Sequence, residues 1–240
     1  MMAAKKKELD ASIIIPAYNE EKYIGACLGS IKRQKFAGRF EVILGDGNSK
    51  DSTRQIAKDY GARVVLENYG TPSGGRYAAT KIARGKILVF VSADVEISPN
   101  YLTDICGVFS NRKVAWAMAR IAPSEGNAIE KFGAWILNGA ARILNPLGIA
   151  YVNADCLAAR ADSYHRVGGF NPKLVTSEDT DLGKRLMWCG KFAYASKAVS
   201  YLSMRRVRKW GYFRFVVFHT TNFFKTHLFS SAAERYDPVR

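Results

Sequence analysis

Cysteine is scarce in this chain, and none of its cysteines stands close to another. The sequence has four of them, at positions 27, 106, 156 and 189, with no Cys-x-x-Cys pair. This spacing indicates neither a zinc site nor a disulfide framework, so we expect a protein of a reducing compartment.

Long apolar runs are also missing. Nowhere do about 18 consecutive apolar residues occur, which is the length that a membrane-spanning helix needs. The first ten residues, MMAAKKKELD, include lysines with no apolar segment behind them, so we expect no secretory signal peptide. The prediction is a cytoplasmic protein that does not cross a membrane by itself.

Acidic residues are few relative to basic ones. The chain has 36 Lys and Arg residues against 21 Asp and Glu, a formal net charge of +15. Such an excess favours phosphate in nucleic acid, anionic lipid or a nucleotide substrate, and charge alone does not choose among these.

With 240 residues and no internal repeat or linker, we expect a single domain over residues 1–240.

Short apolar runs alternate with segments of helical period in the first half of the chain. The runs at residues 12–15, 41–44, 63–66 and 87–91 predict buried strands. The helices between and after them are expected to begin near Asn19, Ser52, Ser73 and Ser98, with Ile56 and Tyr60 buried in the second. This alternation predicts an α/β fold with a mostly parallel sheet flanked by helices.

After about residue 120 the rhythm changes. Apolar residues recur at helical spacing over residues 129–144, which predicts an amphipathic helix. This second half is expected to shape the substrate site. Trp116, Trp135 and Trp188 are expected in the core.

Polar side chains follow three of the predicted strands at the point where each strand ends. They lie in residues 16–20, 45–49 and 92–96 and include Asp46 and Asp94. Because ligands bind at the carboxyl ends of parallel strands, these two carboxylates are expected to converge, one on a base or ribose and one on a divalent metal. Alternatively each aspartate only shapes a turn, and it is the pair that favours a ligand site.

The order of the motifs resembles the family 2 glycosyltransferases of the GT-A fold. The matching segments are SIIIPAYNEE, VILGDGNSKDST, GKILVFVSAD, and GGFNP followed by SEDTDLGKRL, over residues 12–210. The resemblance implies a Rossmann-like nucleotide-binding half (about 10–120) and an acceptor half (about 121–210), and residues 211–240 form a C-terminal tail beyond it. The residues that it assigns to nucleotide binding are Pro16, Ala17, Tyr18, Glu20 and Asp46.

The family's metal motif is Asp-x-Asp, and this chain has Ser92-Ala93-Asp94 in its place. The resemblance therefore implies that Asp94 holds a divalent metal, Mg²⁺ or Mn²⁺, with Ser92 and Ala93 beside the nucleotide. Ser92 is expected to meet the ribose, and Glu96 to supply a second oxygen. The segment GGRYAAT resembles the family's Ala-Arg-Asn stretch, which implies that Arg76 contacts the diphosphate or the base.

The Glu178-Asp179 pair resembles the family's general-base site. Inverting transfer needs a carboxylate that takes the proton of the acceptor hydroxyl as its oxygen attacks the anomeric carbon, and Asp179 is the expected base. The alternative is that Ser177, Glu178 and Asp179 only cap a helix, as Asp181 is expected to do.

A basic run follows where the family often has Gln-x-x-Arg-Trp. The residues expected to contact the diphosphate or the acceptor are Arg205, Arg206, Lys209 and Trp210. Because the Gln and the Arg of that motif are absent, we expect a non-processive enzyme. The alternative is a solvated basic face.

The tail mixes phenylalanines with Arg214 and Lys225, which is typical of a helix that lies on an anionic membrane surface. It could equally be a core helix or the interface of a homodimer. In the first case the protein is expected to be peripheral on the cytoplasmic face of the membrane.

Three classes of function compete for this sequence. A nucleotidyltransferase should have a Gly-rich basic loop after the first strand, whereas PAYNEE is followed by its first cation only at Lys22. A nucleic-acid-binding module needs no set of carboxylates at strand ends and has a recognisable motif, which is absent here. We therefore expect a glycosyltransferase that uses a UDP- or GDP-sugar and a hydroxyl acceptor, with a lipid-linked acceptor left open and no nucleic acid partner.

Overall fold

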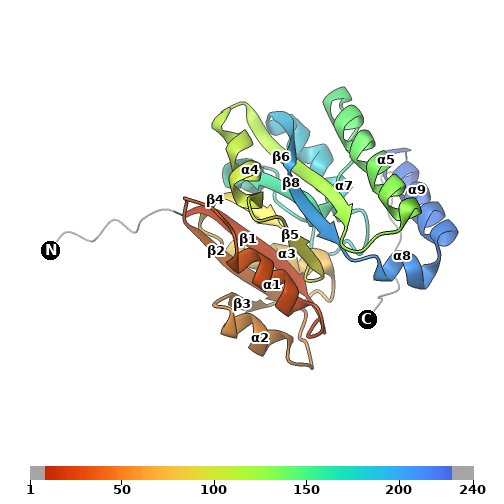
Figure 1. The fold of residues 1–240 in the computed structure, drawn as a ribbon. Helices are drawn as coiled ribbons and strands as arrows, with labels where there is room; N and C mark the ends of the chain where they lie inside the picture. Colours follow the sequence, from red (N-terminus) through yellow and green to blue (C-terminus); the bar gives the residue numbers. More distant parts are fainter. Residues whose placement is uncertain (1–8, 229–240) are drawn as a thin grey trace.

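Four apolar segments of the first half form parallel strands in the computed structural model, which describes residues 9–228 (Figure 1). They lie side by side in the order β3-β2-β1-β4, and each contains all or nearly all of one predicted run. Ile13, Ile43 and Val89 in the middle of these strands have no exposed surface, as expected for strands covered on both faces. Their bounds are β1 (Leu9–Ala17), β2 (Phe40–Asp46), β3 (Arg63–Leu66) and β4 (Gly85–Phe90).

Helices connect these strands, but the first begins later than predicted. Helix α1 (Ile24–Lys32) has Tyr23 at its N-cap, so the predicted cap at Asn19 is wrong. Asn19 has a φ of 54° and joins two loops instead, since its Oδ1 accepts from Lys50 N at 2.8 Å. The Asn19 side chain therefore accepts a hydrogen bond from a neighbouring loop rather than from the first turn of a helix.

The other predicted helices of this half are present. Helix α2 (Thr53–Asp59) is confirmed, but Tyr60 beside it is 42% exposed, so its predicted burial is wrong. Helix α3 (Pro72–Lys81) begins after Thr71, whose side chain accepts from Gly74 N at 2.8 Å. Strand β5 (Val95–Ile97) precedes helix α4 (Tyr101–Gly107), which begins after Asn100 rather than at Pro99.

The second half continues the same sheet. Strands β6 (Val114–Pro123), β7 (Leu157–Arg160) and β8 (Lys191–Leu202) extend it in the order β4-β7-β6-β8-β5. Strand β7 runs antiparallel to β4 and β6, and β8 runs parallel to β6 and antiparallel to β5. An eight-stranded, mostly parallel sheet flanked by helices therefore passes through both halves, and the predicted α/β class is confirmed.

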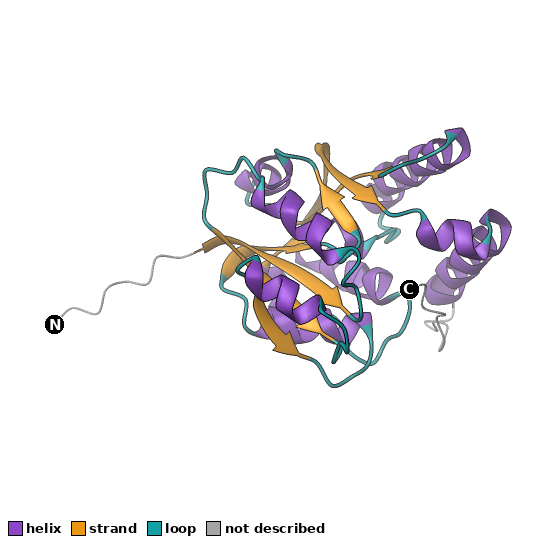
Figure 2. Ribbon diagram, turned by 60° about the horizontal axis from the view of Figure 1, so that its bottom comes forward, coloured by secondary structure: helices purple, strands orange, loops and turns teal. Residues whose placement is uncertain are grey.

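The remaining helices belong to the second half. Helices α5, α8 and α9 lie at the end of the molecule away from β3 and α2, as Figures 1 and 2 both show. Within residues 9–228, no helix combines the length and the apolar character that crossing a membrane requires. The bounds are α5 (Ala128–Leu144), α6 (Ala161–Arg166), α7 (Glu178–Leu186), α8 (Arg205–Trp210) and α9 (Tyr212–Leu228), with short 3-10 turns at Val108–Ser110, Asn145–Leu147, Ala154–Cys156 and Met187–Cys189.

The tryptophans and the amphipathic helix follow the sequence predictions only in part. Trp116 is fully buried, but Trp135 and Trp188 are 70% and 91% exposed, so their predicted place in the core is wrong. Helix α5 covers the predicted residues, yet many of its apolar side chains face outward. Most of the predicted tail is the helix α9, and residues 229–240 lie outside the described residues.

Close packing of β2 against α3 depends on two glycines. A Cβ on Gly45 would lie 2.0 Å from the carbonyl oxygen of Gly75, which leaves no room for any side chain. Since Asp46 follows Gly45 and Arg76 follows Gly75, this contact sets the spacing of two predicted site residues.

We predict that Gly45→Ala lowers the free energy of unfolding by about 3 kcal/mol, because the clash is with backbone that cannot turn away. Urea denaturation followed by circular dichroism measures the change. The matched control is Gly107→Ala in α4, where a Cβ meets nothing within 4 Å and the helical backbone favours alanine. Equal stability of the two variants would contradict the packing argument.

Candidate active site

The predicted nucleotide residues lie together at the carboxyl ends of β1 and β2. In the strand register Pro16 pairs with Gly45 and Ala17 pairs with Asp46. Tyr18, the next residue, is 38% exposed, and a Cβ on Gly47 would lie 3.3 Å from the Tyr18 Cβ, so the ring extends from a loop that touches the β2 turn. Parallel pairing therefore brings these residues to one edge of the sheet, as the sequence predicted.

Asp46 is a fully buried carboxylate with unused hydrogen-bonding capacity. Its Oδ2 accepts from Ser49 N at 3.0 Å and lies 3.6 Å from Arg54 Nε. Its Oδ1 is buried and has no hydrogen-bond partner in the structure. Because a buried acceptor without a donor costs free energy, Oδ1 is the natural place for an N–H donor from a ligand.

Asp94 and Glu20 share one cation from the far end of the chain. Arg205 donates to both carboxylate oxygens of Glu20, at 2.7 and 2.9 Å, and its Nε lies 3.0 Å from Asp94 Oδ2. Its guanidinium also stacks 4.2 Å from the ring centroid of Tyr23. The antiparallel pairing of Val95 with Leu202 explains the contact, because it places the end of β8 beside the start of β5.

A carboxylate that the sequence motifs do not predict lies next to Ser92. The Ser92 hydroxyl donates to Asp155 Oδ1, so its predicted ribose contact competes with this bond. Asp155 precedes β7, and because β7 is antiparallel to β4 its first residues lie at the edge where β4 ends. The predicted second oxygen donor, Glu96, instead pairs with Arg33 at 3.8 Å. The one available signal was an acidic residue just before a short apolar run.

The GT-A fold implies a divalent cation at this edge of the sheet. Burial raises the pKa of Asp94, and the negative charge of Asp155 raises it further, a repulsion that a cation beside them would relieve. Within residues 9–228 no three His, Cys, Asp or Glu side chains are grouped to hold a metal. Mg²⁺ is commonly held by one or two carboxylates with substrate phosphates, and Mn²⁺ favours similar oxygen ligands. The donors therefore fit an ion that a bound diphosphate completes, in competition with Arg205.

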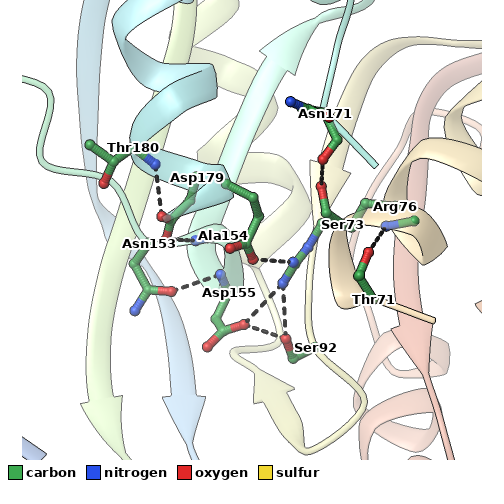
Figure 3. A network of polar contacts seen from close by, with 12 residues as sticks. Thr71, Ser73, Arg76, Ser92, Asn153, Ala154, Asp155, Asn171, Asp179 and Thr180 are labelled. Atoms are coloured by element: carbon green, nitrogen blue, oxygen red, sulfur yellow. Dashed lines mark hydrogen bonds and ion pairs between the residues drawn. The ribbon is translucent and has the colours of Figure 1, made fainter. Parts of the chain in front are cut away.

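Arg76 is the centre of a buried polar network (Figure 3). Its side chain is only 4% exposed, and its Nη1 donates to Glu178 Oε1 at 2.8 Å. Its Nη2 lies 3.5 Å from Ser92 Oγ and 3.8 Å from Asp155 Oδ1. The guanidinium thus faces carboxylates of the second half, while contact with a diphosphate or a base stays a prediction.

Asp179 stands in the first turn of α7, beside the segment that carries Asp155. Its Oδ1 accepts from Thr180 N at 2.7 Å and its Oδ2 from Ala154 N at 3.3 Å. Burial raises the pKa of Asp179 to about 7, and the adjacent charge of Glu178 contributes to this rise. A carboxylate with such a pKa is suited to accept and release a proton near neutral pH.

The alternative reading of this turn as a helix cap is not supported for Ser177. Its φ is 57° and its side chain makes no capping hydrogen bond. Asp181 forms an ion pair with Arg185 one turn later. Asp181 therefore has a structural partner, whereas Asp179 accepts only from backbone N–H groups.

The rest of the basic run divides between two places. Arg206 lies close enough for its charge to lower the pKa values of Glu20 and Asp94, against the larger opposing effect of burial. Lys209 is exposed, and the Trp210 ring packs 5.3 Å from that of Phe218 in α9. The structure thus brings Arg205 and Arg206 to the site, while Trp210 packs on a helix.

Comparison with known proteins identifies relatives over much of the chain. The family model described as "Glycosyl transferase family 2" matches residues 12–167. Poly(ribitol-phosphate) beta-N-acetylglucosaminyltransferase TarS of Staphylococcus aureus is 38% identical over 100 residues, 39% of this chain and 18% of that protein. Beta-monoglucosyldiacylglycerol synthase of Trichormus variabilis is 26% identical over 194 residues, 73% of this chain and 40% of that protein. The chain therefore spans well under half the length of these curated relatives.

Solved structures share the fold. Residues 1–349 of S. aureus TarS in complex with UDP superpose with a TM-score of 0.66 at 22% identity, over 81% of this chain and 60% of that chain. The mannosyltransferase PcManGT from Pyrobaculum calidifontis, in complex with GDP-Man and Mn²⁺, gives a TM-score of 0.69 at 17% identity, over 95% and 66%. The GT-A type of sheet that the sequence predicted is confirmed by these structures.

We predict that Arg205→Met lowers the free energy of unfolding by about 2 kcal/mol at pH 8, because two half-buried carboxylates lose their shared cation. The loss should shrink at pH 5, since the pKa values of Glu20 and Asp94 are already raised and proton binding then replaces the cation. Urea denaturation at both pH values measures it. Lys209→Met, an exposed lysine of the same helix, is the control, and a loss that does not depend on pH would contradict the electrostatic explanation.

Proposed function

The chain belongs to glycosyl transferase family 2, and from this premise we propose that it moves one sugar from a nucleotide-sugar donor to an acceptor hydroxyl. The observation that carries the proposal is the set of carboxylates at the edge where β1, β2 and β4 end. Asp46 has a free acceptor oxygen, Asp94 stands in a cation site, and Asp179 has a pKa near neutrality. These are the groups that donor binding, leaving-group stabilisation and proton removal require.

We assign the donor's base to Asp46. Uracil and guanine both carry a ring N–H that can donate to the unpartnered Oδ1. The donor is accordingly a UDP- or GDP-sugar, in line with the UDP and GDP-Man in the similar structures. Pro16, Ala17 and Tyr18 form the adjacent wall.

We assign the diphosphate to the cations around Asp94. Arg205 and Arg206 supply fixed positive charge where the leaving nucleotide diphosphate gains negative charge. A Mg²⁺ or Mn²⁺ ion bound there, held by Asp94 with Asp155 nearby, would add Lewis-acid stabilisation of the same oxygens. Glu20 orients Arg205 through its two hydrogen bonds.

We assign the general base to Asp179. Its carboxylate takes the proton of the acceptor hydroxyl while that oxygen forms a bond to the anomeric carbon. The bond between that carbon and the diphosphate oxygen breaks on the opposite face, so the configuration inverts and the electron pair leaves with the nucleotide diphosphate. Glu178 holds the Arg76 ion pair that positions the first turn of α7.

We assign the acceptor to the lipid or lipid-linked class. A relative named for monoglucosyldiacylglycerol synthesis covers 73% of this chain, which supports a lipid or lipid-linked acceptor met at the cytoplasmic face of a membrane. The absence of the Gln-x-x-Arg-Trp motif supports the transfer of a single sugar rather than a polymer.

The test is a panel of UDP- and GDP-sugars assayed for release of nucleotide diphosphate with Mg²⁺, with Mn²⁺ and with a chelator. We predict release with one donor class and a reduction of about 100-fold or more in kcat for Asp179→Asn, because the base is lost. Asp181→Asn, a change in the same helix, should stay close to the wild type. Equal turnover of all three proteins, or no release with any donor, would overturn the assignment.

The pH profile gives an independent check. Because burial raises the pKa of Asp179 to about 7 and only the ionised form accepts a proton, kcat/KM should rise with pH through about 7 and level off above it. The measurement is the rate of nucleotide diphosphate release as a function of pH, from about pH 5.5 to about pH 8.5. A flat profile across that range would contradict the role of Asp179.

A further inference from the structure

Helix α5 buries a charged side chain and exposes most of its large apolar ones, the reverse of an ordinary surface helix. Its two buried residues are Glu130 and Ala141. Its exposed side chains include Trp135 at 70% and Phe132 at 60%, whose rings stack 5.7 Å apart. The further exposed apolar residues of this region are Ile129, Ile136, Leu137, Ile143, Leu147 and Ile149.

Helix α9 has the same inversion. Its buried residues are Asn222 and Thr226, at 7% and 6% exposure. Its outward residues include Phe213 at 84%, Val216 at 58% and Phe224 at 55%. Two separate helices with this pattern indicate a surface that is built for an apolar environment.

Direct hydrogen bonds join the two helices where both begin. Tyr212 OH accepts from Asn127 Nδ2 at 2.9 Å and donates to Glu130 Oε1 at 3.1 Å. Arg208 of α8 donates to the same Glu130 oxygen at 2.9 Å. The two helices thus lie at one end of the molecule (Figures 1 and 2). We call the exposed apolar residues of α5 and α9, together with Leu147 and Ile149, the apolar face.

The charges on these two helices are of one sign. The only acidic residue of α5 and α9 is Glu130, which is buried and bonded to Arg208. The lysines and arginines of these helices, all exposed, are Lys131, Arg142, Arg214 and Lys225. A two-fold contact between copies of the chain would bring such cations toward each other, whereas anionic lipid headgroups complement them.

We propose that the apolar face docks on the surface of an anionic lipid bilayer, with its aromatic side chains among the headgroups and its cations on lipid phosphates. Helix α8 then links the bilayer to the reaction centre, because Arg205 at its start contacts Asp94 and its end adjoins α9. This inference rests on the proposed function only for the lipid-linked acceptor. Binding to the bilayer itself requires no nucleotide-sugar donor.

The experiment is cosedimentation of the full chain with phosphatidylcholine vesicles that contain phosphatidylglycerol, and with vesicles of phosphatidylcholine alone. We expect binding to the anionic vesicles, and a loss of about tenfold or more in affinity for the double variant Trp135→Ser/Phe213→Ser. The matched control is Tyr60→Ser, another exposed aromatic, which directly follows α2 at the other end of the molecule and should bind as the wild type does.

Where the wild type binds anionic vesicles, two outcomes would still overturn the docking surface. One is equal binding of the double variant and the control. The other is a wild-type dimer, seen by light scattering, that the double variant converts to a monomer, since the apolar face would then belong to a second copy. Nucleotide diphosphate release is measured on the same proteins without vesicles. Release without lipid binding removes only this inference, and lipid binding without release removes only the proposed function.

Discussion

The ion pair between Arg76 and Glu178 joins the two halves of the protein at the proposed reaction centre. Arg76 is in α3 and Glu178 begins α7, yet their side chains meet at 2.8 Å with the guanidinium 4% exposed. A charge buried this far needs its partner, because losing either one leaves the other uncompensated in the interior. Asp179 is the next residue along the chain, and Ser92 and Asp155 lie on the other side of the guanidinium. The position of the proposed base relative to the nucleotide half thus depends on this contact.

Strand direction decides which side chains join that centre. Because β7 runs against β4, Asp155 arrives from the start of a strand at the same edge that Asp94 reaches after the end of one. Because β5 runs against β8, Arg205 arrives beside Asp94. The resulting site has one carboxylate that the family motif supplies, a second from another part of the chain, and an arginine between Asp94 and Glu20. Arg205 and Arg76 each contact two carboxylates at this edge, and the repulsion between Asp94 and Asp155 remains.

Helix α8 connects the cation site at Asp94 to the apolar face. Helix α8 has Arg205 at one end and the Trp210 packing against α9 at the other, so the cation site and the apolar face are consecutive in the chain. Glu130 fixes this arrangement, since Arg208 and Tyr212 both donate to it, and the bonds from Arg208 hold its pKa down at about 2. Polar groups hold α5 and α9 to the protein while their apolar groups face outward, which is consistent with a function at an interface.

The sequence by itself determined the strands of the first half and the strand ends where we propose that the donor binds. Continuous apolar runs specify buried strands whatever their partners are, and Asp46 and Asp94 stand shortly after such runs. It did not determine which distant residues contact the strand ends. The second carboxylate near Asp94 is Asp155 rather than Glu96, and Asn19 binds a neighbouring loop rather than capping a helix. The apolar spacing predicted the helix at residues 129–144 but not that its apolar side chains face outward. The prediction that Trp135 lies in the core was therefore wrong. Local patterns encode the type of element, whereas strand direction and the partner of each helix face come from contacts between distant residues, which only the tertiary structure decides.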